Sequence, residues 1–398
     1  MTDTTRAEWA QGWPLPIIGM LGFSGVTAFA FTGGIFIEPV TRDLGWSRTQ
    51  FSSALLVQTL VGMLFVPFIG QMVDRFGSRR VALCGIVPFV LAFMLYAQVT
   101  GPIWQWWAAG AIMAVLGGFV SQVVWVKAIV GHFTKTRGLA LAIVLCGAGL
   151  GGIIWPPVAA YIVIHHGWRM AYIVMGLSWG AVMLPLVYFL FPETQHKPVE
   201  KQAKPDDFRL IDALKTRTFI CLALAASIYT SISLALTVHM VPILQGQGLG
   251  LTEAAGLIGL IGIFAIVGRL VTGFLLDRCP TRPVAICIFL MPIAIALLLQ
   301  NAHGSIWAAS LAIAVLGFAN GGDGDVVAYI TGKQFRAAEF GRVYAPLTSL
   351  FSMAASVGPV VVSATYDHWH SYDVFLWAII PMALIAAVAA SLVPLGPK

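Results

Sequence analysis

The chain has 398 residues, of which 59% are hydrophobic and only 10% are charged, and its net charge is +6 at neutral pH. Soluble globular proteins carry about 25% charged residues, so this balance excludes an ordinary soluble domain and indicates a protein that crosses a membrane repeatedly. The basic residues are scattered over many short segments, which argues against a nucleic-acid-binding face.

Twelve apolar stretches follow one another along the chain, each long enough to cross a hydrocarbon core about 30 Å thick as a helix. We expect these spans at 14–37, 49–73, 80–99, 103–130, 138–163, 169–191, 217–244, 253–276, 283–301, 305–330, 340–365 and 372–394. The first span is too long for a signal peptide, and eleven more follow it. The sequence therefore predicts an all-α, polytopic membrane protein.

Lysine and arginine fall mainly in alternate joints between the spans. With the N-terminus placed inside, the inner joints hold 18 of the 23 basic residues, and the outer joints hold Arg42, Arg48 and Arg169. The positive-inside rule then places both termini in the cytoplasm. The five cysteines lie in spans or on the inner side, so no disulfide is expected.

The two halves of the chain repeat each other. The pairs that coincide at a shift of 202 or 203 residues are Pro39 and Pro242, Gly70 and Gly273, Asp74 and Asp277, Arg75 and Arg278, Phe133 and Phe335, and Pro157 and Pro359. We expect a six-helix bundle at 1–191, a cytoplasmic linker at 192–216, and a second six-helix bundle at 217–398. Such repeats are typical of transporters, whose substrate site lies near the bilayer midplane between the halves.

The joint after the second span has the sequence Gly-Gln-Met-Val-Asp-Arg-Phe-Gly-Ser-Arg-Arg, at 70–80. It resembles the signature between helices 2 and 3 of the major facilitator superfamily, and the resemblance implies that superfamily's fold and a conformational latch. The latch residues would be Gly70, Asp74, Arg75, Gly77, Arg79 and Arg80, with Asp277 and Arg278 in the second half. Asp74 can cap a helix or pair with a basic neighbour. The alternative is a turn with solvated charges.

Further segments resemble the monocarboxylate porter branch of this superfamily and its bacterial relatives, which include the oxalate:formate exchangers. They lie at 45–48, 132–142, 147–152, 167–169, 239–242, 268–270, 317–325 and 340–344. The resemblance implies a carrier of small organic acids, usually with a proton and sometimes by anion exchange. We expect a monomer in a bacterial inner membrane, with no cofactor and no enzymatic activity.

Arg269 is the candidate substrate-binding residue. It lies about two thirds of the way through its span, where an unpaired arginine costs at least about 2.5 kcal/mol. Its guanidinium can bind a carboxylate through two parallel hydrogen bonds. The branch resemblance also places the substrate-binding arginine at this position. The alternative is an arginine held permanently in a structural ion pair.

Asp323 and Asp325 are the candidate proton-coupling residues, since they are the only acids deep in any span. Burial favours a neutral aspartate and a nearby arginine favours a charged one, so arriving substrate can change its protonation. The two residues face different directions on a helix, so only one can face Arg269 directly. The alternative is a permanent structural ion pair that offsets the free-energy cost of a charged Arg269 in the bilayer.

Two further residues have a candidate role and an alternative. His239 can exchange a proton near neutrality, or it can be a hydrogen-bonded interfacial histidine. Lys127 can be a second anion contact, or its side chain can reach the cytoplasm from the inner end of its span.

Two patterns suggest sites that we do not expect. Gly147-x-Gly149-x-x-Gly152 matches a dinucleotide-binding loop, but it lies within an apolar span and predicts close helix packing. The segment at 366–370 resembles a metal-binding tract, but it lacks cysteines and lies in an outer joint.

The leading interpretation is proton-coupled uptake of a small organic monocarboxylate by alternating access. Anion exchange, or proton-driven efflux of organic acids or drugs, is the alternative within the same fold. A non-transporting membrane sensor is a remote alternative from another class.

Overall fold

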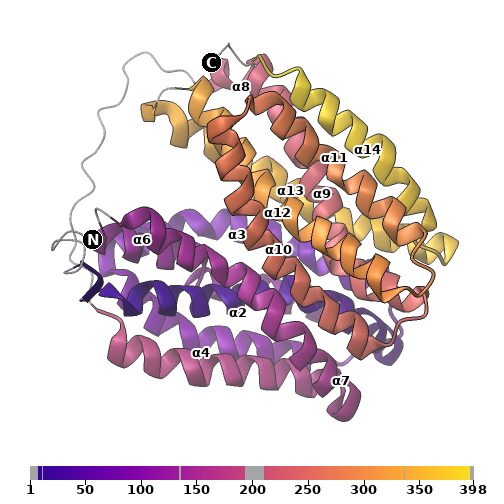
Figure 1. Cartoon of the computed structure of the whole chain (residues 1–398). Helices are drawn as coiled ribbons and strands as arrows, with labels where there is room; N and C mark the ends of the chain where they lie inside the picture. Colours follow the sequence, from indigo (N-terminus) through magenta and orange to yellow (C-terminus); the bar gives the residue numbers. More distant parts are fainter. Residues whose placement is uncertain (1–7, 11, 134–135, 193–209, 336, 395–398) are drawn as a thin grey trace. The chain divides into compact units, whose positions relative to one another are not determined.

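The computed structural model describes residues 8–10, 12–133, 136–192, 210–335 and 337–394, and this part of the chain contains helices and no strand (Figure 1). The helices are α2 (Pro14–Leu44), α3 (Arg48–Phe76), α4 (Ser78–Ala97), α5 (Ile103–Gly118), α6 (Gln122–His132), α7 (Arg137–Leu190), α8 (Leu210–Leu214), α9 (Arg217–Gly246), α10 (Leu251–Arg278), α11 (Thr281–Gln300), α12 (Ile306–Gln334), α13 (Ala337–Trp369) and α14 (Asp373–Ser391).

The described residues supply the twelve predicted membrane helices. Eleven helical segments of the described residues, one of which combines α5 and α6, are long and apolar enough to cross a membrane. One of them, α7, has 54 residues, and its backbone leaves helical geometry at Gly167, where φ is 81° and ψ is 167°. Glycine adopts this positive φ without steric cost. α7 therefore contains both of the spans predicted at 138–163 and 169–191, and the all-α fold with twelve crossings is confirmed.

The span predicted at 103–130 differs from the expectation because it is not one continuous helix. α5 ends at Gly118 and α6 begins at Gln122. The Trp125 indole donates a hydrogen bond to the Val120 carbonyl oxygen at 2.7 Å, which satisfies a backbone group within the interruption. The break places Ser121 at the N-terminus of α6, where its hydroxyl makes no capping hydrogen bond.

The chain divides into two compact units, 1–198 and 199–398. The helices of the two units follow the same order, because α9, α10, α11 and α12 each begin 203 residues after α2, α3, α4 and α5 respectively. This spacing extends the repeat seen in the sequence to the start of each helix. Most of the linker predicted at 192–216 lies outside the described residues, as do both chain ends and residues 134–135, but its described end contains α8.

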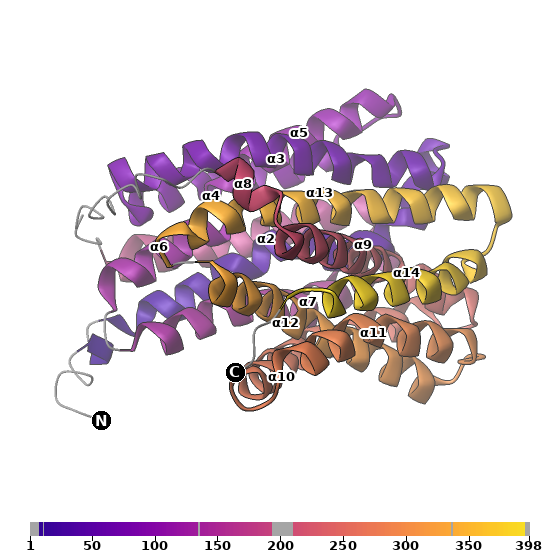
Figure 2. The same ribbon diagram turned by 90° about the horizontal axis from the view of Figure 1, so that it is seen from above.

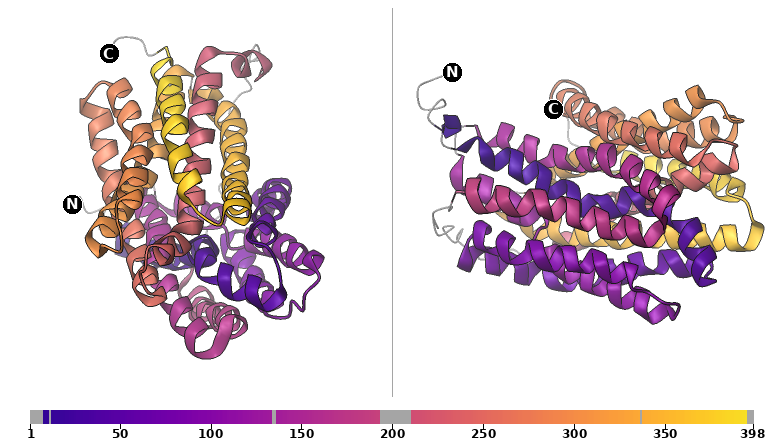
Figure 3. Two further views of the ribbon diagram at one scale, coloured as in Figure 1. Left: turned by 90° about the vertical axis from the view of Figure 1, so that its right-hand side faces the viewer. Right: turned by 90° about the horizontal axis from the view of Figure 1, so that it is seen from below.

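Glycines allow one helix pair in each unit to approach closely. In the N-terminal unit α2 packs along α7 (Figure 3), and a Cβ added at Gly147 would collide with the Met20 carbonyl oxygen. The close helix packing predicted at 147–152 is therefore confirmed. A second pair, α3 and α5, lies side by side in the same unit (Figure 2).

In the C-terminal unit α10 and α12, which the repeat relates to α3 and α5, also pack closely together (Figure 1). A Cβ at Gly268 would collide with the Phe318 carbonyl oxygen, and one at Gly321 would collide with the Ala265 carbonyl oxygen. The two backbones thus approach each other closely at Arg269 and in the turn before it. This contact sets the distance between the polar residues of the two helices.

Candidate functional site

Arg269 on α10 and Asp325 on α12 form an ion pair in the C-terminal unit. Arg269 Nε lies 3.8 Å from Asp325 Oδ1, which is within the range of charge attraction and beyond that of a hydrogen bond. The side chains are 41% and 33% exposed. Within the described residues the buried Nε of Arg269 makes no hydrogen bond. The pair leaves the guanidinium with donors that an incoming carboxylate can use.

Asp323 has different neighbours from Asp325, although both lie on α12. It interacts with Arg269 only over a longer distance, and its carboxylate accepts a hydrogen bond from the Gly324 backbone N–H. It is also within electrostatic range of the buried Tyr229 hydroxyl on α9. The two aspartates therefore face different groups, and Asp325 is the one that pairs with Arg269.

The polar cluster continues from Asp323 towards α9. The Tyr229 hydroxyl donates to Asn320 Oδ1 at 3.0 Å, and the Ser233 hydroxyl donates to the same oxygen at 2.5 Å. On the other side, the Tyr344 hydroxyl of α13 is within electrostatic range of Arg269 and both aspartates. Four helices of the C-terminal unit thus contribute polar groups around the Arg269–Asp325 pair.

His239 on α9 lies in a separate hydrogen-bonded setting and is fully buried. Its Nδ1 lies 3.2 Å from the Tyr372 hydroxyl, and its Nε2 lies 3.0 Å from the Pro359 carbonyl oxygen and 3.3 Å from the Ser363 hydroxyl. These partners hold the ring against α13, as expected for a hydrogen-bonded histidine. Its proton-coupling role stays a prediction.

Lys127 on α6 binds the predicted latch segment in the N-terminal unit. Its ammonium lies 2.6 Å from Asp74 Oδ1 and donates to the Gly70 carbonyl oxygen at 2.8 Å. A Cβ at Gly70 would meet only the Lys127 Nζ, at 3.8 Å, so within this unit the space beside Gly70 is occupied by the ammonium. Asp74 therefore pairs with a basic neighbour, which was one of its two expected roles.

The other latch residues lie at the junction of α3 and α4 or at the equivalent end of α10. Gly77 joins α3 to α4 with φ 83°. The Arg79 guanidinium donates to the Tyr188 carbonyl oxygen of α7 at 2.6 Å. Arg75 and Arg278 each lie over a neighbouring phenyl ring, while Arg80 and Asp277 are exposed. The role of this segment as a conformational latch stays a prediction.

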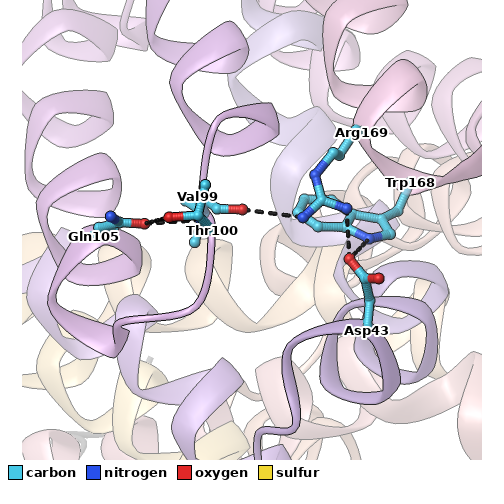
Figure 4. Close-up of polar contacts among 6 residues, drawn as sticks. All are labelled: Asp43, Val99, Thr100, Gln105, Trp168 and Arg169. Atoms are coloured by element: carbon cyan, nitrogen blue, oxygen red, sulfur yellow. Dashed lines mark hydrogen bonds and ion pairs between the residues drawn. The ribbon is translucent and has the colours of Figure 1, made fainter.

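A second charged cluster in the N-terminal unit joins the end of α2, the segment after α4, and the break within α7 (Figure 4). Asp43 Oδ2, at the end of α2, accepts hydrogen bonds from Arg169 Nη1 at 2.5 Å and Trp168 Nε1 at 3.1 Å. Arg169 Nη2 donates to the Val99 carbonyl oxygen at 3.1 Å, and its guanidinium lies over the Trp168 ring. Both terminal nitrogens of Arg169 are thus bonded to the protein, which indicates a structural role.

The family of the chain is decided by its match to a family model. The model described as Major Facilitator Superfamily matches residues 18–324, which is more than half of the chain. The chain belongs to the Major Facilitator Superfamily. Members of this superfamily are membrane transporters and not enzymes, so the protein is an integral membrane protein of the transporter class.

Several curated superfamily relatives are similar to this chain. An uncharacterized MFS-type transporter of Bacillus subtilis is 26% identical over 66% of this chain and 65% of its own length. Monocarboxylate transporter 4 of Mus musculus is 25% identical over 72% of this chain and 62% of its own length. The gallate transporter of Pseudomonas putida is 26% identical over 63% of both chains. The chain thus spans less than two thirds of the length of these relatives.

The fold of a solved transporter also agrees with that of this chain. The crystal structure of a D-xylose-proton symporter matches it with a TM-score of 0.76, at 16% sequence identity, over 96% of this chain and 97% of the other. This similarity shows the fold alone. It confirms the major facilitator fold that the 70–80 segment implied.

Several residues that belong to the polar clusters of this protein were not identified from the sequence. Asn320 directly precedes the Gly321–Asp325 run, and Tyr344 lies in the segment at 340–344, so both were within view. Tyr229 and Ser233 are four residues apart on α9 and share one helix face, a signal that polar residues in an apolar span provide. Asp43 gave no signal, because its partners are more than 120 residues away.

Proposed function

We propose that this protein is a secondary active transporter that takes up a small organic carboxylate together with a proton. The observation that carries the proposal is the loose Arg269–Asp325 pair. Arg269 keeps a permanent charge and has a buried Nε without a hydrogen bond in the described structure. A carboxylate that reached this guanidinium would supply the missing hydrogen bonds.

The relatives support an organic acid as the substrate. One relative is named a monocarboxylate transporter and another a gallate transporter. Gallate is an aromatic carboxylate, so both names describe anions that an arginine can bind. The solved structure with a similar fold is that of a D-xylose-proton symporter, whose substrate is a sugar. These names favour uptake of an organic anion together with a proton over anion exchange or proton-driven efflux.

Asp325 is the proposed proton site. Its carboxylate neutralises Arg269 before substrate arrives, and the breaking of a buried pair costs about 3–5 kcal/mol. This cost is lower here because both side chains are partly exposed. When a substrate carboxylate takes the place of Asp325 beside Arg269, protonation of Asp325 removes the surplus negative charge. Substrate and proton are therefore loaded together.

The remaining parts of the proposal concern placement. The excess of basic residues in alternate joints supports an inner-membrane protein with both termini in the cytoplasm. We propose a bacterial membrane because two of the named relatives are bacterial. Alternating access by one monomer is the expected mode of transport.

Uptake into proteoliposomes tests the proposal. Proteoliposomes that contain the purified protein should accumulate labelled benzoate or lactate when the outside is acidic. A protonophore should stop this accumulation, while exchange of labelled for unlabelled substrate should continue. Accumulation driven equally well by an outward gradient of a second anion, with no dependence on pH, would mean that the protein is an anion exchanger.

A further inference from the structure

A cavity of about 280 Å³ lies within the N-terminal unit, among α2, α3, α4 and α5. Its walls are mostly apolar, and the large side chains among them are Phe29 from α2, Phe89 and Phe93 from α4, and Met113 from α5. The described lining residues include no charged side chain. An apolar cavity of about 150 Å³ accommodates benzene, so this one has room for a ring with small substituents.

Three polar side chains of the described residues line the cavity, Gln58, Thr59 and Ser121, and the first and last of them give it a preference for a hydroxyl group. The Gln58 amide Nε2 lies 2.5 Å from the hydroxyl of the buried Tyr96, and this bond leaves the amide oxygen for another donor. Ser121 also lines the cavity, at the break between α5 and α6. Its hydroxyl oxygen is buried and has no hydrogen-bond partner in the described structure.

The unpartnered Ser121 hydroxyl is the second observation that points to a ligand. A buried hydroxyl without a partner costs about 1–3 kcal/mol, so a ligand that bonds to it gains this energy on binding. Because the phenyl rings of Phe29, Phe89 and Phe93 line the cavity, it favours a flat ring that can pack against them. The absence of a lining cation disfavours an anionic group inside it.

We propose that this cavity binds a hydroxylated aromatic ring of the phenol class. Phenyl and thioether groups surround the ring, Ser121 donates a hydrogen bond to its hydroxyl oxygen, and the Gln58 amide oxygen accepts a hydrogen bond from that hydroxyl. The ring can come from a free phenol or from an aromatic acid that the transporter carries, and only the second source rests on the proposed function.

Gly62 on α3 provides a way to fill the cavity. It lines the cavity, and a Cβ added there would meet no atom within 4 Å. Gly62→Leu can therefore extend into the open space without displacing the core. Gly256 of α10, in the other unit, also has open space around an added Cβ and is exposed, so Gly256→Leu is the matched control.

The test is equilibrium dialysis of labelled phenol against the purified full-length protein. Saturable phenol binding should weaken at least about tenfold in Gly62→Leu and stay unchanged in Gly256→Leu and Arg269→Ala. Wild type should prefer phenol to toluene, and Ser121→Ala should remove most of that preference. This second variant keeps the test decisive if Gly62→Leu does not fold.

The results separate this proposal from the proposed transport function. Phenol binding that persists in Arg269→Ala while carboxylate binding is lost supports the two sites independently. If phenol competes with 4-hydroxybenzoate for uptake, the ring belongs to the carried acid, and if phenol leaves uptake unchanged the cavity binds a free phenol. Wild-type protein without saturable phenol binding, or Gly62→Leu that binds phenol as wild type does, would overturn the proposal.

Discussion

Arg269 Nε and Asp325 Oδ1 lie 3.8 Å apart on two helices whose backbones touch. The glycines of α10 and α12 hold the pair at this distance, so the guanidinium is neutralised without being saturated with hydrogen bonds. A structural pair that only made Arg269 tolerable would gain from a closer bidentate contact. The loose geometry instead leaves room for exchange between the aspartate and another carboxylate.

The first prediction is that Arg269 binds the substrate carboxylate. Arg269→Lys keeps the charge and loses the planar set of donors, so affinity should fall about tenfold or more, since a hydrogen bond to a charged group contributes about 1.5–3 kcal/mol. Arg269→Ala should abolish binding. Equilibrium binding of labelled benzoate to purified protein measures both, with Arg282→Lys as a control at a helix end. Unchanged affinity in folded Arg269→Ala would refute the assignment.

The second prediction concerns the proton. Uptake should rise as external pH falls from about 7 towards about 5, because protonation of Asp325 accompanies anion binding at Arg269. Asp325→Asn should mimic the protonated state, so it should keep binding and exchange and lose pH-driven accumulation. Asp323→Asn should behave nearly as wild type, because Asp323 does not pair directly with Arg269.

Transport assays at several external pH values distinguish the candidate acids. A loss of pH-driven accumulation in Asp323→Asn alone would show that Asp323, and not Asp325, carries the proton. Normal pH dependence in both variants would leave His239 as the next candidate, since it is a buried titratable group with its own hydrogen-bond partners.

The helical architecture could be predicted from the sequence because it depends on hydropathy alone. The lengths of the apolar spans follow from local composition, the repeat of about 203 residues from a comparison of the two halves, and the close packing at Gly147 from the spacing of glycines. The break at residues 119–121 was not predicted, although Gly117, Gly118 and Ser121 are helix-end signals, because the hydropathy of the span is continuous across them. Its hydrogen bond from Trp125 became visible only in the structure.

The candidate site could be predicted only in part. Charged residues in apolar spans identified Arg269, Asp323, Asp325 and Lys127, since each is costly unless it has a function or a partner. Their partners depend on helix rotation and on contacts distant in sequence. Lys127 thus pairs with Asp74, 53 residues earlier, whereas the sequence suggested either an anion contact or a side chain that reaches the cytoplasm.

The third prediction separates these two roles of Lys127. If the Lys127–Asp74 pair is part of a conformational latch, Lys127→Gln and Asp74→Asn should each change the maximal transport rate and leave KM unchanged. The double variant should be no worse than the poorer single variant, because both substitutions remove the same contact. If Lys127 contacts the substrate anion, Lys127→Gln should raise KM while Asp74→Asn does not.

The fourth prediction concerns the packing that positions the Arg269–Asp325 pair. A Cβ at Gly321 would collide with the Ala265 carbonyl oxygen and come within 2.7 Å of the Arg269 backbone nitrogen, so Gly321→Ala must push α10 and α12 apart. Overpacking of this kind costs about 1–3 kcal/mol, and the purified protein should melt at a lower temperature. Because the helices separate beside Arg269, carboxylate affinity should fall as well.

Gly324→Ala is the control three residues away, where an added Cβ meets no atom within 4 Å. It should keep or raise the melting temperature, since alanine favours a helix over glycine by about 0.5–1 kcal/mol. Equal melting temperatures for the two variants would show that the α10–α12 contact tolerates expansion, and the 3.8 Å separation would then have another cause.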